Sequence, residues 1–147
     1  MTDRRKLARR KERLAQVREQ EANVLLSLAD RAVREKEQEI EQAILIHQQS
    51  EEDFFAQQGA AAGAWMEVLQ RSRERHAEQL ETLETELGKL KVDAEEKRKK
   101  HRQTLESLRS SEKVTEKVVN TWKKEQLGKE ARELDEVAGN QARNRED

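Results

Sequence analysis

Apolar residues in the second half of the chain follow a seven-residue repeat. One run steps by three and four positions in alternation, through Leu80, Leu83, Leu87, Leu90 and Ala94. That spacing is typical of the seam of a left-handed coiled coil, because it keeps one stripe of the helix facing its partner. The stripe weakens through 95–104 and resumes at Leu105. Gly139 followed by Asn140 predicts the end of this helix.

The first half carries a similar stripe in two pieces. The first piece comprises Leu7, Leu14, Val17, Val24 and Leu28, and the second comprises Val33, Ile40, Ile44, His47 and Phe54. The phase of the repeat slips near 29–33, so the winding of the supercoil should change there. Thr2 or Asp3 is a candidate cap for the start of this helix.

An uncharged segment at 57–63 separates the halves and contains two of the five glycines. Glycine frees the backbone to turn, and connections between helices need only a few residues. A continuous helix through this alanine-rich segment is the alternative. With a turn, the fold is all-α, a two-helix antiparallel coiled-coil hairpin with an overhanging C-terminal helix. We expect a single coiled-coil domain over 1–147, with a first helix at about 3–57, a turn at about 58–63, a second helix at about 64–139 and a frayed tail at 140–147.

Folding the chain at residue 60 or 61 brings the two apolar stripes opposite one another. Leu7 then faces Val114, whereas the polar stretch around Lys97 and His101 should form a weak middle layer. The longer second helix should project past the first by roughly 30 Å, from about Trp122 onward.

The projecting part keeps an apolar stripe that has no partner inside the hairpin: Trp122, Leu127, Leu134 and Val137. Exposed apolar patches of this kind mark interaction surfaces. A basic cluster lies at the same end of the hairpin: Arg4, Arg5, Lys6, Arg9, Arg10, Lys11 and Arg13. Trp122 is either an ordinary seam residue or the anchor of a binding interface, where Trp is enriched. Because the first helix should end before reaching Trp122, we favour the anchor.

Composition supports long helices and limits the function classes. Of 147 residues, 41% are charged and none is Pro, and two Phe and two Trp are too few for an ordinary globular core. A disordered chain is the alternative, but it would lack the regular apolar stripe. The formal net charge of −1 argues against a general nucleic-acid binder. The basic start resembles a basic leucine zipper, but no Asn precedes Asn23 and the seam already runs inside the basic stretch.

The chain carries no recognisable catalytic or cofactor motif. Without Cys it has no thiolate nucleophile and no disulfide framework. Carboxylates on solvated helices lack the burial that perturbs catalytic groups, so we expect no enzyme, no cofactor, no metal and no small-molecule substrate. His47 and His76 should lie near each other across the hairpin. Two ligands are too few for a structural zinc site, so polar seam residues that help to set the register are the simpler interpretation.

The start of the chain is basic, but no apolar segment of secretory type follows it. The longest apolar runs are far too short to cross a membrane. We therefore expect a cytoplasmic protein.

Three segments carry a resemblance to a known family: the basic start at 4–13, the segment TWKKEQ at 121–126 and the segment ELDEVA at 133–138. Together with the length and the hairpin architecture, they resemble the central-stalk proteins of type III secretion and flagellar export systems, the FliJ/YscO type. The resemblance covers essentially the whole chain.

The resemblance implies a non-enzymatic stalk that inserts its paired termini into the pore of a hexameric secretion ATPase. The hairpin tip would face an export gate membrane protein, and some members also bind secretion chaperones. The location would be cytoplasmic, peripherally associated with a membrane-embedded secretion apparatus. Trp122, Leu127 and Leu134 would then supply an apolar grip, and Arg9, Arg10 and Arg13 would steer the charged encounter.

Two other functions remain open at the level of sequence. A generic structural coiled-coil scaffold would self-associate as a parallel dimer without a hairpin. A basic-region nucleic-acid binder is less favoured, and it predicts an affinity that falls steeply with salt.

Overall fold

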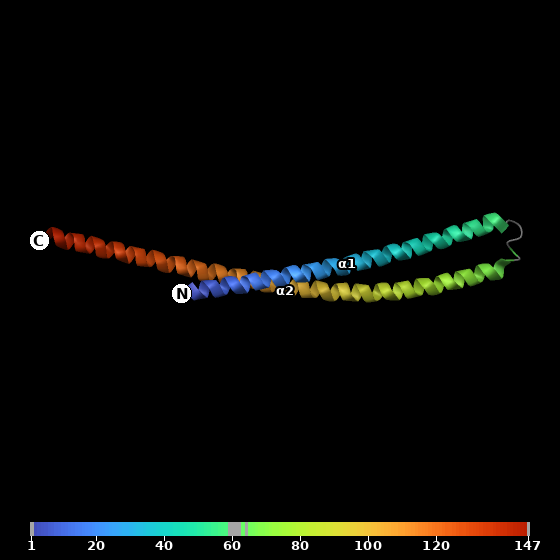
Figure 1. The fold of residues 1–147 in the computed structure, drawn as a ribbon, viewed down its shortest axis with the longest axis horizontal. Coiled ribbons are helices and arrows are strands. Elements are labelled where there is room, and N and C mark those ends of the chain that lie inside the picture. The colour runs from blue at the N-terminus through green and yellow to red at the C-terminus, as the bar shows by residue number, and fades with distance from the viewer. Residues whose placement is uncertain (1, 59–62, 64, 147) are drawn as a thin grey trace. The chain divides into compact units, whose positions relative to one another are not determined.

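The computed structural model describes residues 2–58, 63 and 65–146. Two long helices, α1 (Thr2–Gln58) and α2 (Met66–Glu146), pack antiparallel as a hairpin (Figure 1). Both helices run without interruption because the chain has no Pro and is rich in strong helix formers. The predicted all-α antiparallel hairpin is confirmed. The parallel dimer without a hairpin is not the arrangement that the chain adopts.

The helix bounds agree with the sequence-based expectation at the start of the chain and differ at its end. α1 runs from Thr2 to Gln58, so Asp3, one of the two candidate caps, lies within the first turn, and the side chain of Thr2, the other candidate, lies outside what the structure describes. Most of the predicted turn at 58–63 lies outside the described residues. α2 does not stop at Gly139 but continues to Glu146.

Gly139 fails as a helix stop because its backbone does not take the left-handed conformation that such a stop needs. A glycine inside a helix costs only about 1 kcal/mol relative to Ala. The helix formers on both sides outweigh that cost, and the expected frayed tail at 140–147 is helical through Glu146.

Contacts within the chain group it into two compact units. The terminal unit comprises 1–21 with 102–147, and the central unit comprises 22–101. Their boundary on α2 falls between His101 and Arg102, within the polar stretch of the predicted weak layer.

In the terminal unit, α1 packs through small side chains. Ala8 and Ala15 are buried, at 6% and 8% exposure. The single hydroxyl proton of Thr115 on α2 is shared between two carbonyl oxygens, that of Ser111 at 2.9 Å and that of Ala8 at 3.3 Å. Alanines without bulk let the backbones approach, and larger α2 side chains fill the space beside them. These α2 residues are half-buried: Leu105, Leu108, Val118 and Trp122.

The predicted α1 seam is wrong in its rotation about the helix axis over its first piece, at 7–28. Its second piece is confirmed at Val33, Ile40, His47 and Phe54, which are half-buried, and the covered face runs on from Ala29 to Val33 without the predicted slip of phase. Leu7, Leu14 and Val17 are exposed, at 53%, 49% and 49%, and Val114, the predicted partner of Leu7, is exposed as well. The observed contact joins Ala8 to Thr115, each one residue later than predicted. One residue is about 100° of rotation, so the pairing along the axis is nearly right while the buried face is not.

The central unit repeats this pattern. Its buried α1 residues are Ala22 and Ala29, which continue the seven-residue alanine repeat, and the buried α2 residues are Leu69, Leu83 and Ala94. Val24 and Leu28, which the sequence places in the seam, are each 57% exposed. Ion pairs between the helices, Lys36–Glu86 at 2.8 Å and Arg73–Glu51 at 2.6 Å, flank the seam. Such exposed pairs contribute about 0–1 kcal/mol each, so the apolar seam dominates the packing.

Candidate protein-binding surface

The last part of α2 has no helix beside it. Every residue from Lys129 to Glu146 is exposed. Leu127 and Leu134 are 65% and 70% exposed, which is unusual for large aliphatic side chains with regular spacing. In the terminal unit, α2 therefore extends past the start of α1 (Figure 1). The overhang begins near Lys129, several residues later than the sequence predicts.

Trp122 is reached by the first helix, contrary to the expectation that α1 ends before it. The guanidinium of Arg5 lies over the indole ring, 3.7 Å from its centroid. A cation placed over the face of a Trp ring is attracted by about 0.5–1 kcal/mol at an exposed site. Trp122 is half-buried. It therefore takes part in packing within the chain and still presents part of its ring to the surroundings.

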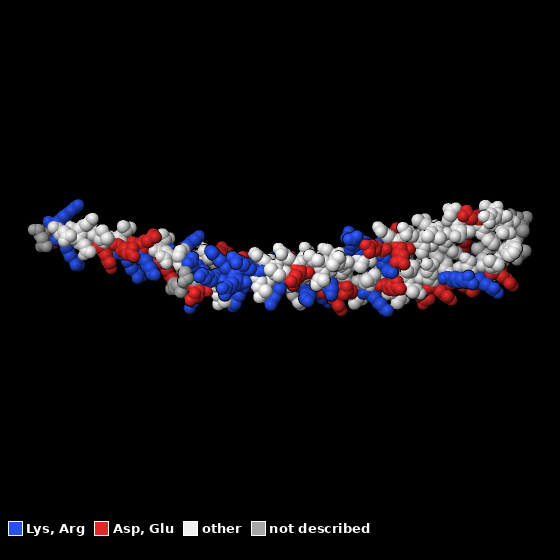
Figure 2. All heavy atoms as spheres, viewed as in Figure 1, with Lys and Arg blue, Asp and Glu red and all other residues white. Residues whose placement is uncertain are grey.

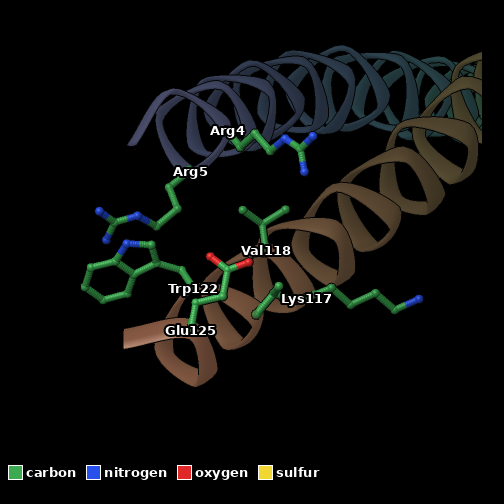
Figure 3. A pocket seen from close by; sticks show the side chains of 7 residues that line it. Arg4, Arg5, Lys117, Val118, Trp122 and Glu125 are labelled. Atoms are coloured by element: carbon green, nitrogen blue, oxygen red, sulfur yellow. The ribbon is translucent and has the colours of Figure 1, made fainter. Parts of the chain in front are cut away.

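A hollow of about 160 Å³ opens beside this contact (Figure 3). Its lining residues come from both helices: Arg4, Arg5, Lys117, Val118, Thr121, Trp122 and Glu125. Small-molecule sites usually measure about 300–1,000 Å³, so this hollow is sized for one protein side chain. Arg5 Nε is buried and has no hydrogen-bond partner among the described residues. Three cations and the single carboxylate of Glu125 surround an apolar floor, so the lining keeps an excess of positive charge and favours an acidic or aliphatic side chain.

The basic cluster covers the first turns of α1. Figure 2 shows Lys and Arg gathered over this part of the chain. Arg9, Arg10 and Arg13 are exposed, and within the described part of the chain none of them forms an ion pair. Unpaired cations on a helix surface are available to an acidic partner.

The structure brings only some of the predicted site residues together. Trp122 shares its hollow with Arg5, whereas Arg9, Arg10 and Arg13 do not line it. Leu127 and Leu134 lie further along α2, and Leu134 borders a shallow depression with Glu130, Glu133 and Val137. Sequence reasoning missed four lining residues: Lys117, Val118, Thr121 and Glu125. Val118 and Glu125 could have been identified, because residues four and three positions from Trp122 lie on the same face of a helix.

Two of the three histidines of the central unit, His47 and His76, meet as predicted. The imidazole rings of His47 and His76 stack with centroids 3.9 Å apart and planes 7° from parallel. His47 Nε2 lies 3.0 Å from a carboxylate oxygen of Glu51, which also accepts a hydrogen bond from Arg73 at 2.6 Å. Burial, assisted by His47, lowers the pKa of His76, and the Arg73 hydrogen bond lowers the pKa of Glu51. Within the described residues, no group of three His, Asp or Glu side chains is placed to hold a metal ion.

Neither helix, over its described residues, contains an apolar stretch long enough to cross a membrane. Comparisons with protein-family models, with curated proteins and with solved structures find no match to this chain.

Proposed function

We propose that the terminal unit is a protein-binding surface and that the chain works as a non-enzymatic stalk gripped by a hexameric secretion ATPase. The observation that carries the proposal is the collection, on one unit, of unpaired cations, a hollow beside Trp122 and an open aliphatic stripe on α2. A partner that surrounds the paired ends of the chain can use all three features.

Each feature has a separate physical role in that interaction. The cations on α1 attract an acidic lining at a distance and speed the encounter. Trp122 and the aliphatic side chains Leu127 and Leu134 lose their contact with water once they are enclosed, which stabilises the complex. Arg5, already stacked on Trp122, holds the indole in place before binding.

The remaining partners in this proposal follow from the resemblance to type III export stalks. An export gate membrane protein would meet the hairpin at its other end, and secretion chaperones would bind elsewhere on the helices. The chain would then be located in the cytoplasm at a membrane-embedded secretion apparatus.

Capture of the ATPase from cell extract by the purified chain tests the apolar part of the proposal. We expect Trp122→Ala and Leu134→Ala each to weaken binding by about tenfold to a hundredfold, because buried anchors cost about 2 kcal/mol or more when truncated. Leu45→Ala is the matched control, since Leu45 is 63% exposed but belongs to the central unit. Equal binding by all three variants would remove the terminal unit from the interface.

The charge part of the proposal is tested by binding kinetics. Replacing Arg9 and Arg13 with Glu should lower the association rate and flatten its dependence on salt. Lys89→Glu with Lys91→Glu makes the same charge change in the central unit and should leave the rate nearly unchanged. A rate that falls equally in both double variants would mean that net charge, not this surface, governs the encounter.

A further inference from the structure

Two exposed stripes in the terminal unit have the same residues at the same spacing. The stripe on α1 consists of Leu7, Leu14 and Val17, and the stripe on α2 consists of Leu127, Leu134 and Val137. Both contain Leu, Leu and Val separated by seven and then three positions. All six side chains are between 49% and 70% exposed.

Neither stripe is used by the hairpin. On α1 the stripe lies well away from the buried face that Ala8 and Ala15 form, because neighbouring residues are about 100° apart around a helix. On α2, Leu134 and Val137 lie in the segment from Lys129 to Glu146, in which every residue is exposed. A spacing of seven and three is the pattern by which one helix packs into another, so each stripe is suited to a helical partner.

At two matching positions between the leucines the stripes carry opposite charges, although Glu12 also lies beside the α1 stripe and Lys129 and Arg132 beside the α2 stripe. Arg10 and Arg13 lie between the leucines of the α1 stripe, and Glu130 and Glu133 occupy the corresponding positions of the α2 stripe. Within the described residues none of these four side chains forms an ion pair. Further cations, Lys6, Lys11 and Arg18, border the α1 stripe.

We propose that two copies of this chain associate by exchanging their C-terminal tails, so that the α2 stripe of each copy packs on the α1 stripe of the other. In parallel register, Leu127 packs against Leu7 of the other copy, Leu134 against Leu14 and Val137 against Val17. The same register sets Glu130 beside Arg10.

The direction of the helices makes this exchange reciprocal. In the terminal unit, α1 runs inward from its free end, whereas α2 runs outward past that end (Figure 1). A tail can lie parallel to α1 of a second copy only if the two terminal units point in opposite directions. That arrangement also lays the second tail on the first copy's α1, so the interface closes on itself as a two-fold dimer.

The charges disfavour the simpler pairing of like stripes. Two α1 stripes packed together in parallel would set Arg10 against Arg10 and Arg13 near Arg13, and two tails would set Glu130 against Glu130. Like charges placed opposite one another are repelled, whereas the exchanged tails pair unlike charges. With six aliphatic side chains from each copy, we expect a weak dimer whose population depends on concentration.

Sedimentation equilibrium of the purified full-length chain and of its charge-reversal variants tests the exchange. We expect Arg10→Glu and Glu130→Arg each to weaken the dimer by about tenfold or more. In either variant, positions 10 and 130 carry the same charge, so like charges meet at both contacts of the dimer. An equimolar mixture of the two variants should dimerise like the unaltered chain, since the mixed dimer restores an unlike pair at both contacts. Circular dichroism should show unchanged helicity, as both side chains are exposed.

Cross-linking identifies the register independently of the charges. Leu14→Cys mixed with Leu134→Cys should form a disulfide between chains, whereas Leu14→Cys alone should not; the chain has no other Cys. A chain that stays monomeric at all accessible concentrations would overturn the proposal. So would a mixture of charge variants that fails to recover, or a ladder of species larger than the dimer.

This inference does not depend on the proposed export partner, and its tests use the purified chain alone. A failure to capture the ATPase leaves the dimer measurements intact, and a monomeric chain leaves ATPase capture intact. Because both interactions use Leu127 and Leu134, a tail held by a second copy is unavailable to another partner.

Discussion

The stacked imidazoles of His47 and His76 are the most tightly defined polar contact of the central unit. The groups that face them come from both helices: Glu51 on α1, which accepts the Arg73 hydrogen bond, and Arg73 and Arg75 on α2. Two rings 3.9 Å apart can stack easily only while at least one is neutral. Burial lowers the pKa of His76 below its ordinary value, so folding favours the neutral form of this ring.

The stability of the chain should therefore depend on pH near the ordinary pKa of histidine. Below 6.5 the unfolded chain binds a proton at His76 that the folded chain resists, so stability is full above that pH and falls as the pH is lowered. Urea unfolding followed by circular dichroism at pH values above and below 6.5 measures this loss.

Two variants separate this effect from general acid sensitivity. His76→Gln should reduce the loss of stability between about pH 7 and pH 5.5, whereas Gln79→Ala, beside the stack on α2, removes no titrating group and should leave it in place. Glu51 contributes at lower pH, because its lowered pKa makes its contribution disappear only as the pH falls below 4.5. Identical pH profiles for the unaltered chain and His76→Gln would refute the assignment.

At the scale of the element, the first half of α1 carries two possible seams and buries the one with smaller side chains, whereas the second half covers larger residues such as Ile40 and Phe54. Alanine recurs every seven residues at positions 8, 15, 22 and 29, and all four are buried. The larger residues beside them, such as Leu28 at 57% exposure, point elsewhere. Alanines permit close approach of the backbones, and the larger side chains come from α2.

Substituting one alanine and one neighbouring leucine of α1 distinguishes the two possible seams. Ala29→Leu should destabilise the hairpin by about 1–3 kcal/mol, because added methylenes overpack a tight contact. Leu28→Gln should change stability by no more than about 0.5 kcal/mol, because the side chain is exposed. Denaturant midpoints measure both. The opposite order, with Leu28→Gln the more damaging, would indicate that the leucine stripe is the seam in solution.

At the scale of the whole molecule, the chain covers one apolar face of each helix by packing its two helices against each other. A lone helix of this length would leave that face in water, and an antiparallel partner supplied by the same chain costs only the entropy of closing one loop. The residues left exposed by this pairing are those available for a second copy or another protein.

Intramolecular cross-linking tests the hairpin in solution. His47→Cys combined with His76→Cys should react with a short thiol cross-linker within a single chain, because these side chains touch. Leu45→Cys with His76→Cys is the control and should react poorly, since Leu45 is largely exposed. Products of twice the mass from the first pair, at low protein concentration, would contradict the hairpin.

The candidate site could be predicted only in outline. Trp122, Leu127 and Leu134 stand out in the sequence because they are large apolar residues beyond the expected end of α1. The hollow around Trp122 could not be predicted, because it depends on the exact register of the two helices, which places Arg5 over the indole ring. The length of the overhang depends on the same register, which is why the sequence began it too early.

The sequence favours the antiparallel pairing over a continuous helix and a parallel dimer, and the structure confirms it. The sequence by itself determined that this chain forms long helices with apolar stripes, because helix propensity and apolar period are local properties. It also determined the approximate pairing along the axis, as the meeting of His47 and His76 confirms. Only the tertiary structure decided which face is buried over the first half of α1, where Ala8, Ala15, Ala22 and Ala29 are covered and the neighbouring leucines are not. That choice depends on how closely the side chains of both helices fit together, which the apolar pattern of one helix does not specify.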